Sequence, residues 1–128
     1  MERLYKKISE ICGSEYPDIV DDDEIYYKSS GAPAKLRVHI IDGSFLDIWL
    51  SNTGKYSYHW ERRHIDGKVY RHDNAPHKKR AQVNTYPKHF HQGTDEKVVE
   101  SSIPDDPIKA VRYVMDYVRK KSKTSDLE

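Results

Sequence analysis

The sequence predicts an α+β fold, an antiparallel meander of about five strands with N- and C-terminal helices packed on one face. Aliphatic and polar residues alternate through the middle of the chain, between turns rich in Gly, Asp and Asn. Apolar residues with helical spacing lie near both ends. The 128 residues suit one domain, 1–128, in which residues 122–128 form a frayed tail.

The two terminal segments have the spacing of amphipathic helices. Over residues 2–12, one apolar stripe is made by Leu4, Ile8 and Ile11. Gly13 is a suitable C-cap for this helix. Asp105-Asp106-Pro107 starts the second helix, with an Asp N-cap before Pro at the first helical position. The stripe of the second helix is made by Ile108, Val111, Met115 and Val118.

Residues 34–50 predict a β-hairpin with an aliphatic row on each strand. A two-residue Asp-Gly loop would divide the two rows between opposite faces of the sheet. A three-residue loop, 42–44, pairs Ile40 with Leu46 and unites the rows on one face. We prefer this register, which sets His39 opposite Asp47 and Arg37 opposite Trp49.

Two further strands are predicted at 56–65 and 69–74, joined by a turn at 65–68. The alternation extends the apolar face with Tyr58, Trp60, Tyr70 and His72. It places a polar set on the other face: His59, Glu61, Arg63, Arg71 and Asp73. Weaker strands are expected at 24–30 and 98–103, with 21–23 as an acidic turn and 75–97 as an extended loop rich in Pro, Lys and His.

Composition narrows the classes of function. The 22 basic and 21 acidic residues nearly cancel, so nucleic-acid binding would depend on local clusters such as Lys78-Lys79-Arg80. The lone Cys12 excludes an internal disulfide, and no segment has the apolar length of a membrane span or a signal peptide. We therefore expect a cytoplasmic protein without membrane contact.

Six of the seven histidines lie between Tyr56 and His91, among Arg, Asp and aromatic residues. Histidine beside a carboxylate can carry protons, and arginine can bind phosphate. These parts suit RNA cleavage without a metal or other cofactor: Arg71 binds the scissile phosphate and Asp73 orients a histidine. The acid and the base come from His59, His77 or His89.

Two alternatives stay open for this cluster. His89 and His91, two residues apart on an extended segment, could share a metal ion with His77 or Asp73 as the third ligand, as in a catalytic metal site. The chain could also be a non-enzymatic protein that blocks a protein or RNA target by binding it.

Several of these motifs resemble those of the TumE family, the toxins of small bacterial and archaeal toxin–antitoxin modules. The resemblance covers most of the chain and rests on Tyr-x-Tyr-His-Trp at 56–60, the Gly67 turn, Arg-x-Asp-Asn-Ala-Pro-His at 71–77, and Pro-x-His-x-His at 87–91. Family members often have two adjacent histidines after Ala-Pro, where this chain has His77-Lys78.

The resemblance implies a toxin that a helix-turn-helix antitoxin neutralises. It also implies that the site includes His59, Trp60, Arg71, Asp73, Asn74, His77, His89 and His91. Of these, Trp60, Asn74 and His91, together with Lys88, are our candidate substrate contacts. We expect RNA or the ribosome as the target, and a homodimer is a further option.

Overall fold

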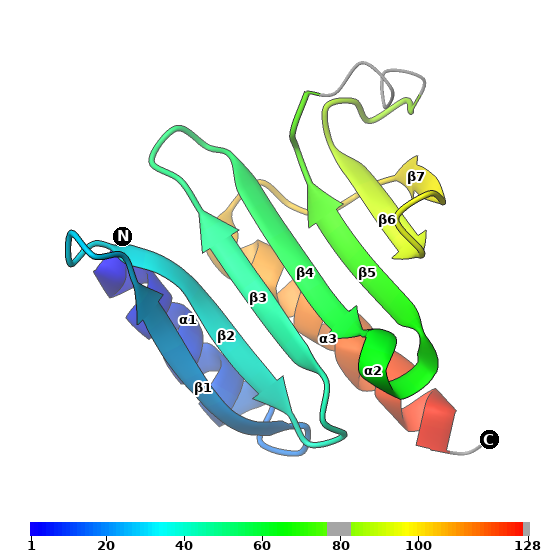
Figure 1. The fold of residues 1–128 in the computed structure, drawn as a ribbon, viewed down its shortest axis with the longest axis horizontal. Helices are drawn as coiled ribbons and strands as arrows, with labels where there is room; N and C mark the ends of the chain where they lie inside the picture. The colour runs from blue at the N-terminus through cyan, green and yellow to red at the C-terminus, as the bar shows by residue number, and fades with distance from the viewer. Residues whose placement is uncertain (77–82, 127–128) are drawn as a thin grey trace.

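The computed structural model describes residues 1–76 and 83–126, which form an α+β fold with one open antiparallel sheet (Figure 1). The strands are β1 (Val20–Tyr27), β2 (Pro33–Ile40), β3 (Phe45–Leu50), β4 (Tyr56–Arg62), β5 (Lys68–Asp73), β6 (His89–Gly93) and β7 (Val98–Glu100). The helices are α1 (Glu2–Glu15), α2 (Arg63–Asp66) and α3 (Pro107–Asp126). The predicted fold class is therefore confirmed.

The seven strands follow one another across the sheet in chain order, and each is antiparallel to its neighbour. This number is a little higher than the predicted five, because both weaker strands form, as β1 and β7, and β6 lies within 75–97, where a loop was expected. The acidic run 21–23 is also not a turn but part of β1. As β1 is an edge of the sheet, exposed carboxylates there discourage pairing with another chain.

Helices α1 and α3 lie side by side behind one face of the sheet in Figure 1. The core between these layers joins Tyr5 and Ile8 of α1, Trp60 of the sheet, and Val111 and Met115 of α3. Among the described residues, no helix combines the length and the apolar character that crossing a bilayer requires. The opposite face of the sheet carries the polar side chains.

Both long helices extend beyond their predicted ends. Helix α1 passes through Gly13, the predicted cap, and ends at Glu15. Asp106 caps α3 as predicted, since its carboxylate accepts a hydrogen bond from the amide of Lys109 at 3.0 Å. Helix α3 then continues to Asp126, into the segment 122–128 that was expected as a tail.

The β2–β3 hairpin has a register two residues away from the predicted one. Val38 lies opposite Leu46, and Arg37 opposite Asp47, because 41–43 form the loop. The expected pairing of His39 with Asp47 is therefore wrong, and His39 lies opposite Phe45. A shift of two residues keeps every side chain on its face, so the aliphatic rows still meet in the core.

The second Ile-Asp-Gly segment forms a single helical turn, α2, in place of a plain hairpin turn. It ends at Gly67, whose φ of 77° is in the left-handed region that glycine adopts readily. Beyond it, Trp60 pairs with Tyr70, and His59 with Arg71. The predicted division of β4 and β5 into an apolar and a polar face is confirmed.

Candidate functional site

Three adjacent strands place the polar candidates on the face of the sheet away from α1 and α3. Arg71 on β5 lies between His59 on β4 and His91 on β6, and the next row pairs Asp73 with His89. Because side chains alternate along a strand, all five project to one side. The pairing of β5 with β6 thus unites residues that are 16 to 20 positions apart in the sequence.

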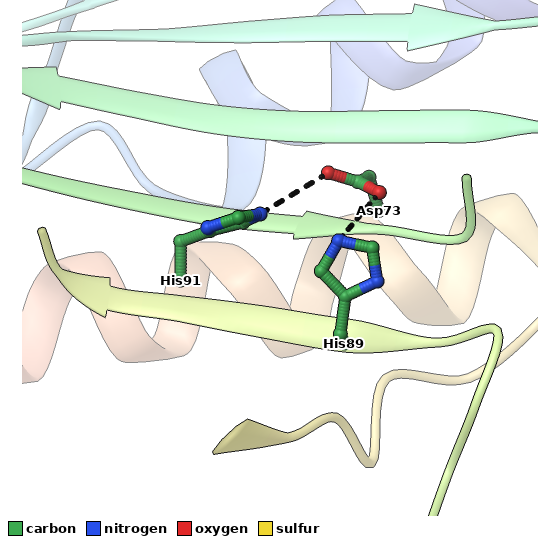
Figure 2. A group of neighbouring side chains, drawn as sticks. All are labelled: Asp73, His89 and His91. Atoms are coloured by element: carbon green, nitrogen blue, oxygen red, sulfur yellow. Dashed lines mark ion pairs between the residues drawn. The ribbon is translucent and has the colours of Figure 1, made fainter. Parts of the chain in front are cut away.

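Asp73 is the centre of this cluster (Figure 2). Its carboxylate lies 2.9 Å from Nε2 of His89 and 3.6 Å from Nε2 of His91, and it accepts a 2.9 Å hydrogen bond from Nε of Arg71. Burial alone would raise the pKa of this carboxyl, but the hydrogen bonds from the Ala75 amide and Arg71 hold the pKa well below its usual range. Asp73 is therefore an anion in the folded protein.

Both ring nitrogens of His89 contact oxygen atoms. Its Nδ1 lies 2.9 Å from the carbonyl oxygen of Pro87 and its Nε2 lies 2.9 Å from the Asp73 carboxylate. Both partners are hydrogen-bond acceptors, so a ring that carries a proton on each nitrogen satisfies both contacts and forms an ion pair with Asp73. The side chain of His89 is only 1% exposed.

The ring nitrogens of His91 have different kinds of partner. Its Nδ1 donates to the carbonyl of Asp95 at 2.9 Å, while Nη2 of Arg71 lies 3.0 Å from its Nε2. Arginine can only donate, so in this contact Nε2 of His91 is the acceptor. The guanidinium of Arg71 therefore holds an imidazole lone pair and a carboxylate oxygen at once.

His59 lies on the neighbouring strand with its own carboxylate. Its Nε2 is 3.0 Å from Oε1 of Glu61, and its side chain is 19% exposed. The hydrogen bond from Arg63 lowers the pKa of Glu61 to about 2, so Glu61 is ionised at neutral pH. Nε2 of His59 therefore donates, and in the neutral form of the ring Nδ1 can accept a proton.

The other predicted site residues lie elsewhere. Trp60 is on the helix-covered face, 1% exposed, and its Nε1 donates to Ser44 Oγ at 2.8 Å. Asn74 links β5 to the β3–β4 turn through the Tyr56 amide and the Gly54 carbonyl. Lys88 pairs with Asp105 at 3.2 Å. His77, like the basic run 78–80, falls outside the described residues.

The sequence interpretation missed Asp95, in the turn between β6 and β7. Its backbone carbonyl orients His91, and its side chain lies 3.4 Å from Nη1 of Arg71 and 4.0 Å from Nη1 of Arg63. The signal was weak, because one acidic residue after Gly93-Thr94 is ordinary in a turn. Asp95 joins the cluster only because this turn folds beside β5.

The cluster also contains a potential set of metal ligands. Asp73, His89 and His91 each offer one potential ligand atom, and these three atoms lie within 4.8 Å of one another. This set is the alternative that the spacing of the two histidines suggested, with Asp73 as the third ligand. Arg71 now contacts two of these three side chains.

A family model described as Toxin TumE matches residues 9–122 of the chain. No curated protein and no solved structure matches the chain.

Proposed function

Because the chain belongs to the TumE toxin family, we propose that it arrests growth by cleaving RNA with its own side chains, without a metal ion. A toxin of this kind implies an antitoxin, and we propose a helix-turn-helix protein for that role. The observation that carries the proposal is the position of Arg71, a partly exposed cation held among ionised and proton-carrying groups on one sheet face.

Arg71 is the proposed phosphate ligand. A guanidinium has five N–H donors, and its contacts with Asp73, His91 and Asp95 use three of them. The Arg71 side chain is 28% exposed, so its remaining donors can bind a phosphate that approaches from solvent. Asp73 and His91 position the guanidinium, which stabilises the negative charge that develops on the phosphate.

His59 is the proposed general base. In its neutral form, the ring directs Nε2–H at Glu61 and keeps the lone pair of Nδ1 for the 2′-hydroxyl proton. The 2′-oxygen then bonds to phosphorus and the bond from phosphorus to the 5′-oxygen breaks. The leaving 5′-oxygen takes a proton from an acid, for which His77 and His89 are the two candidates.

The test uses protein made by cell-free synthesis and an end-labelled RNA, in buffer with EDTA. We expect cleavage that leaves 2′,3′-cyclic phosphate and 5′-hydroxyl ends. Arg71→Ala and His59→Ala should each slow it by about 10²–10⁴-fold, as removal of a charge or proton carrier does. His77→Ala and His89→Gln separate the two candidate acids. His39→Ala is the matched control, because His39 lies on β2 beside Glu24, outside the cluster.

Other outcomes would contradict the proposal. Growth arrest without any RNA cleavage would show that the protein blocks its target by binding. Cleavage that requires a divalent ion and leaves 3′-hydroxyl ends would show a metal-dependent hydrolase. Circular dichroism of each variant establishes that it is folded before its activity is compared.

A further inference from the structure

His89 and His91 direct the same ring nitrogen at one carboxylate. Figure 2 shows both side chains projecting from β6 toward Asp73 on β5. The side chains of both histidines are 1% exposed and that of Asp73 is 11% exposed. Two imidazoles and a carboxylate thus converge at a point that is nearly closed to solvent.

Each imidazole is held from behind by a backbone carbonyl. Nδ1 of His89 contacts the Pro87 oxygen and Nδ1 of His91 contacts the Asp95 oxygen, both at 2.9 Å. Histidines that bind metals in proteins almost always donate their second N–H in this way, which fixes the ring and turns the other nitrogen to the ion. The carboxylate is fixed as well, since Asp73 accepts from the Ala75 amide at 3.0 Å.

The guanidinium of Arg71 places a positive charge beside these potential ligands. It contacts one oxygen of Asp73 at 2.9 Å and Nε2 of His91 at 3.0 Å. These are atoms that a metal ion would need, so the guanidinium and an ion compete for them. Arg71 is the most exposed of the four side chains, so it can move toward solvent while the other three stay in place.

We propose that Asp73, His89 and His91 bind a divalent transition-metal ion, such as Zn²⁺, in exchange for the guanidinium of Arg71. A tetrahedral zinc site with bonds of about 2.0–2.1 Å separates its ligand atoms by roughly 3.3–3.4 Å. The three ligand atoms lie within 4.8 Å of one another, so small side-chain rotations would close the site. Two imidazoles and one carboxylate suit zinc, cobalt or nickel better than magnesium or calcium, which prefer oxygen ligands.

The exchange also predicts a consequence for activity, and this part rests on the proposed function. An ion bound here takes the lone pair of His91 and displaces Arg71 from His91 and Asp73. The phosphate-binding arrangement of Arg71 is then lost. Zinc should therefore inhibit RNA cleavage.

The experiment measures Zn²⁺ affinity by competition with a chromophoric chelator, and Co²⁺ binding by visible absorption. Wild-type protein should bind one ion, and His89→Ala and His91→Ala should each bind it about tenfold or more weakly. Arg71→Met keeps all three ligands and removes the competing cation, so it should bind Zn²⁺ more tightly than wild type. His59→Ala is the control for a histidine on the same face that is not a ligand.

Unchanged affinity in both ligand variants would overturn the site. Affinity in Arg71→Met that is equal to or weaker than that of wild type would overturn the exchange. His89→Gln and His91→Gln, checked by circular dichroism, replace any alanine variant that does not fold. Metal binding is measured without RNA, so its failure is distinct from a failure of the proposed ribonuclease activity. Binding without inhibition of a working ribonuclease would overturn only the predicted effect on activity.

Discussion

Replacing Arg62 by methionine tests whether a buried cation holds one end of the sheet together. The guanidinium of Arg62 is 4% exposed and lies between the carboxylates of Asp42, in the β2–β3 loop, and Asp66, in α2. It also lies over the ring of Trp60, 4.8 Å from the ring centroid. Methionine keeps much of the apolar contact with this ring but removes the charge and the donors.

The expected cost follows from the exposure of the two carboxylates. Removing one partner of a fully buried ion pair destabilises a protein by about 3–5 kcal/mol. Here the Asp42 side chain is 22% exposed and also accepts two hydrogen bonds from Ser44, and Asp66 is 38% exposed. Water can therefore solvate part of each carboxylate once its arginine partner is removed. We expect Arg62→Met to lower the free energy of unfolding by about 3 kcal/mol, the low end of that range.

Urea unfolding at pH 7 measures this change, with Arg119→Met as a matched control. Arg119 also pairs with a carboxylate, Asp18, and lies over an aromatic ring, Tyr16, but its side chain is 33% exposed. Exposed pairs contribute about 1 kcal/mol or less. If the two variants lose equal stability, burial does not determine how much these arginines stabilise the protein, which would refute the prediction.

Two buried titratable groups give further predictions. Burial lowers the pKa of His72 to about 4 from its ordinary value of 6.5, so below pH 6.5 the unfolded chain binds a proton that the folded protein excludes. On this account the free energy of unfolding should fall by about 3 kcal/mol between pH 6.5 and 4. Urea unfolding of His72→Gln should show a smaller fall over the same pH range. A fall equal to that of wild type would contradict the assignment of this pH dependence to His72. Burial raises the pKa of Cys12 to about 12, so at pH 8 we expect a thiol-specific chromogenic reagent to label it at least about 100-fold faster in denaturant than in the folded protein. Rapid labelling of the folded protein would show that Cys12 is accessible.

The faces of the strands could be predicted from the sequence because alternation is a local property. Trp60 and His59 are neighbours in the chain, so they lie on opposite faces of β4 in any register. This rule assigned Tyr70 and His72 to the core and Arg71 to the polar face. The same rule argues against a substrate contact for Trp60, which the motif-based interpretation had included.

The register of the β2–β3 hairpin could not be predicted in this way. Registers that differ by two residues place the same side chains in the core, so the hydrophobic pattern is equally satisfied by both. Only the loop conformation at 41–43 separates them, and it decides that Asp47 pairs with Arg37 and not with His39.

The sequence by itself determined which polar residues are candidates for the chemistry and which face of the sheet presents those on β4 and β5, because strand periodicity and turn chemistry act over a few neighbouring residues. Only the tertiary structure decided that His89 and His91 form a strand beside Asp73 and Arg71. That pairing joins segments separated by a long connection, and its stability comes from packing and hydrogen bonds between elements. The contacts of Nε2 in both histidines depend on the same pairing, since Asp73 and Arg71 come within reach only once β5 and β6 have paired.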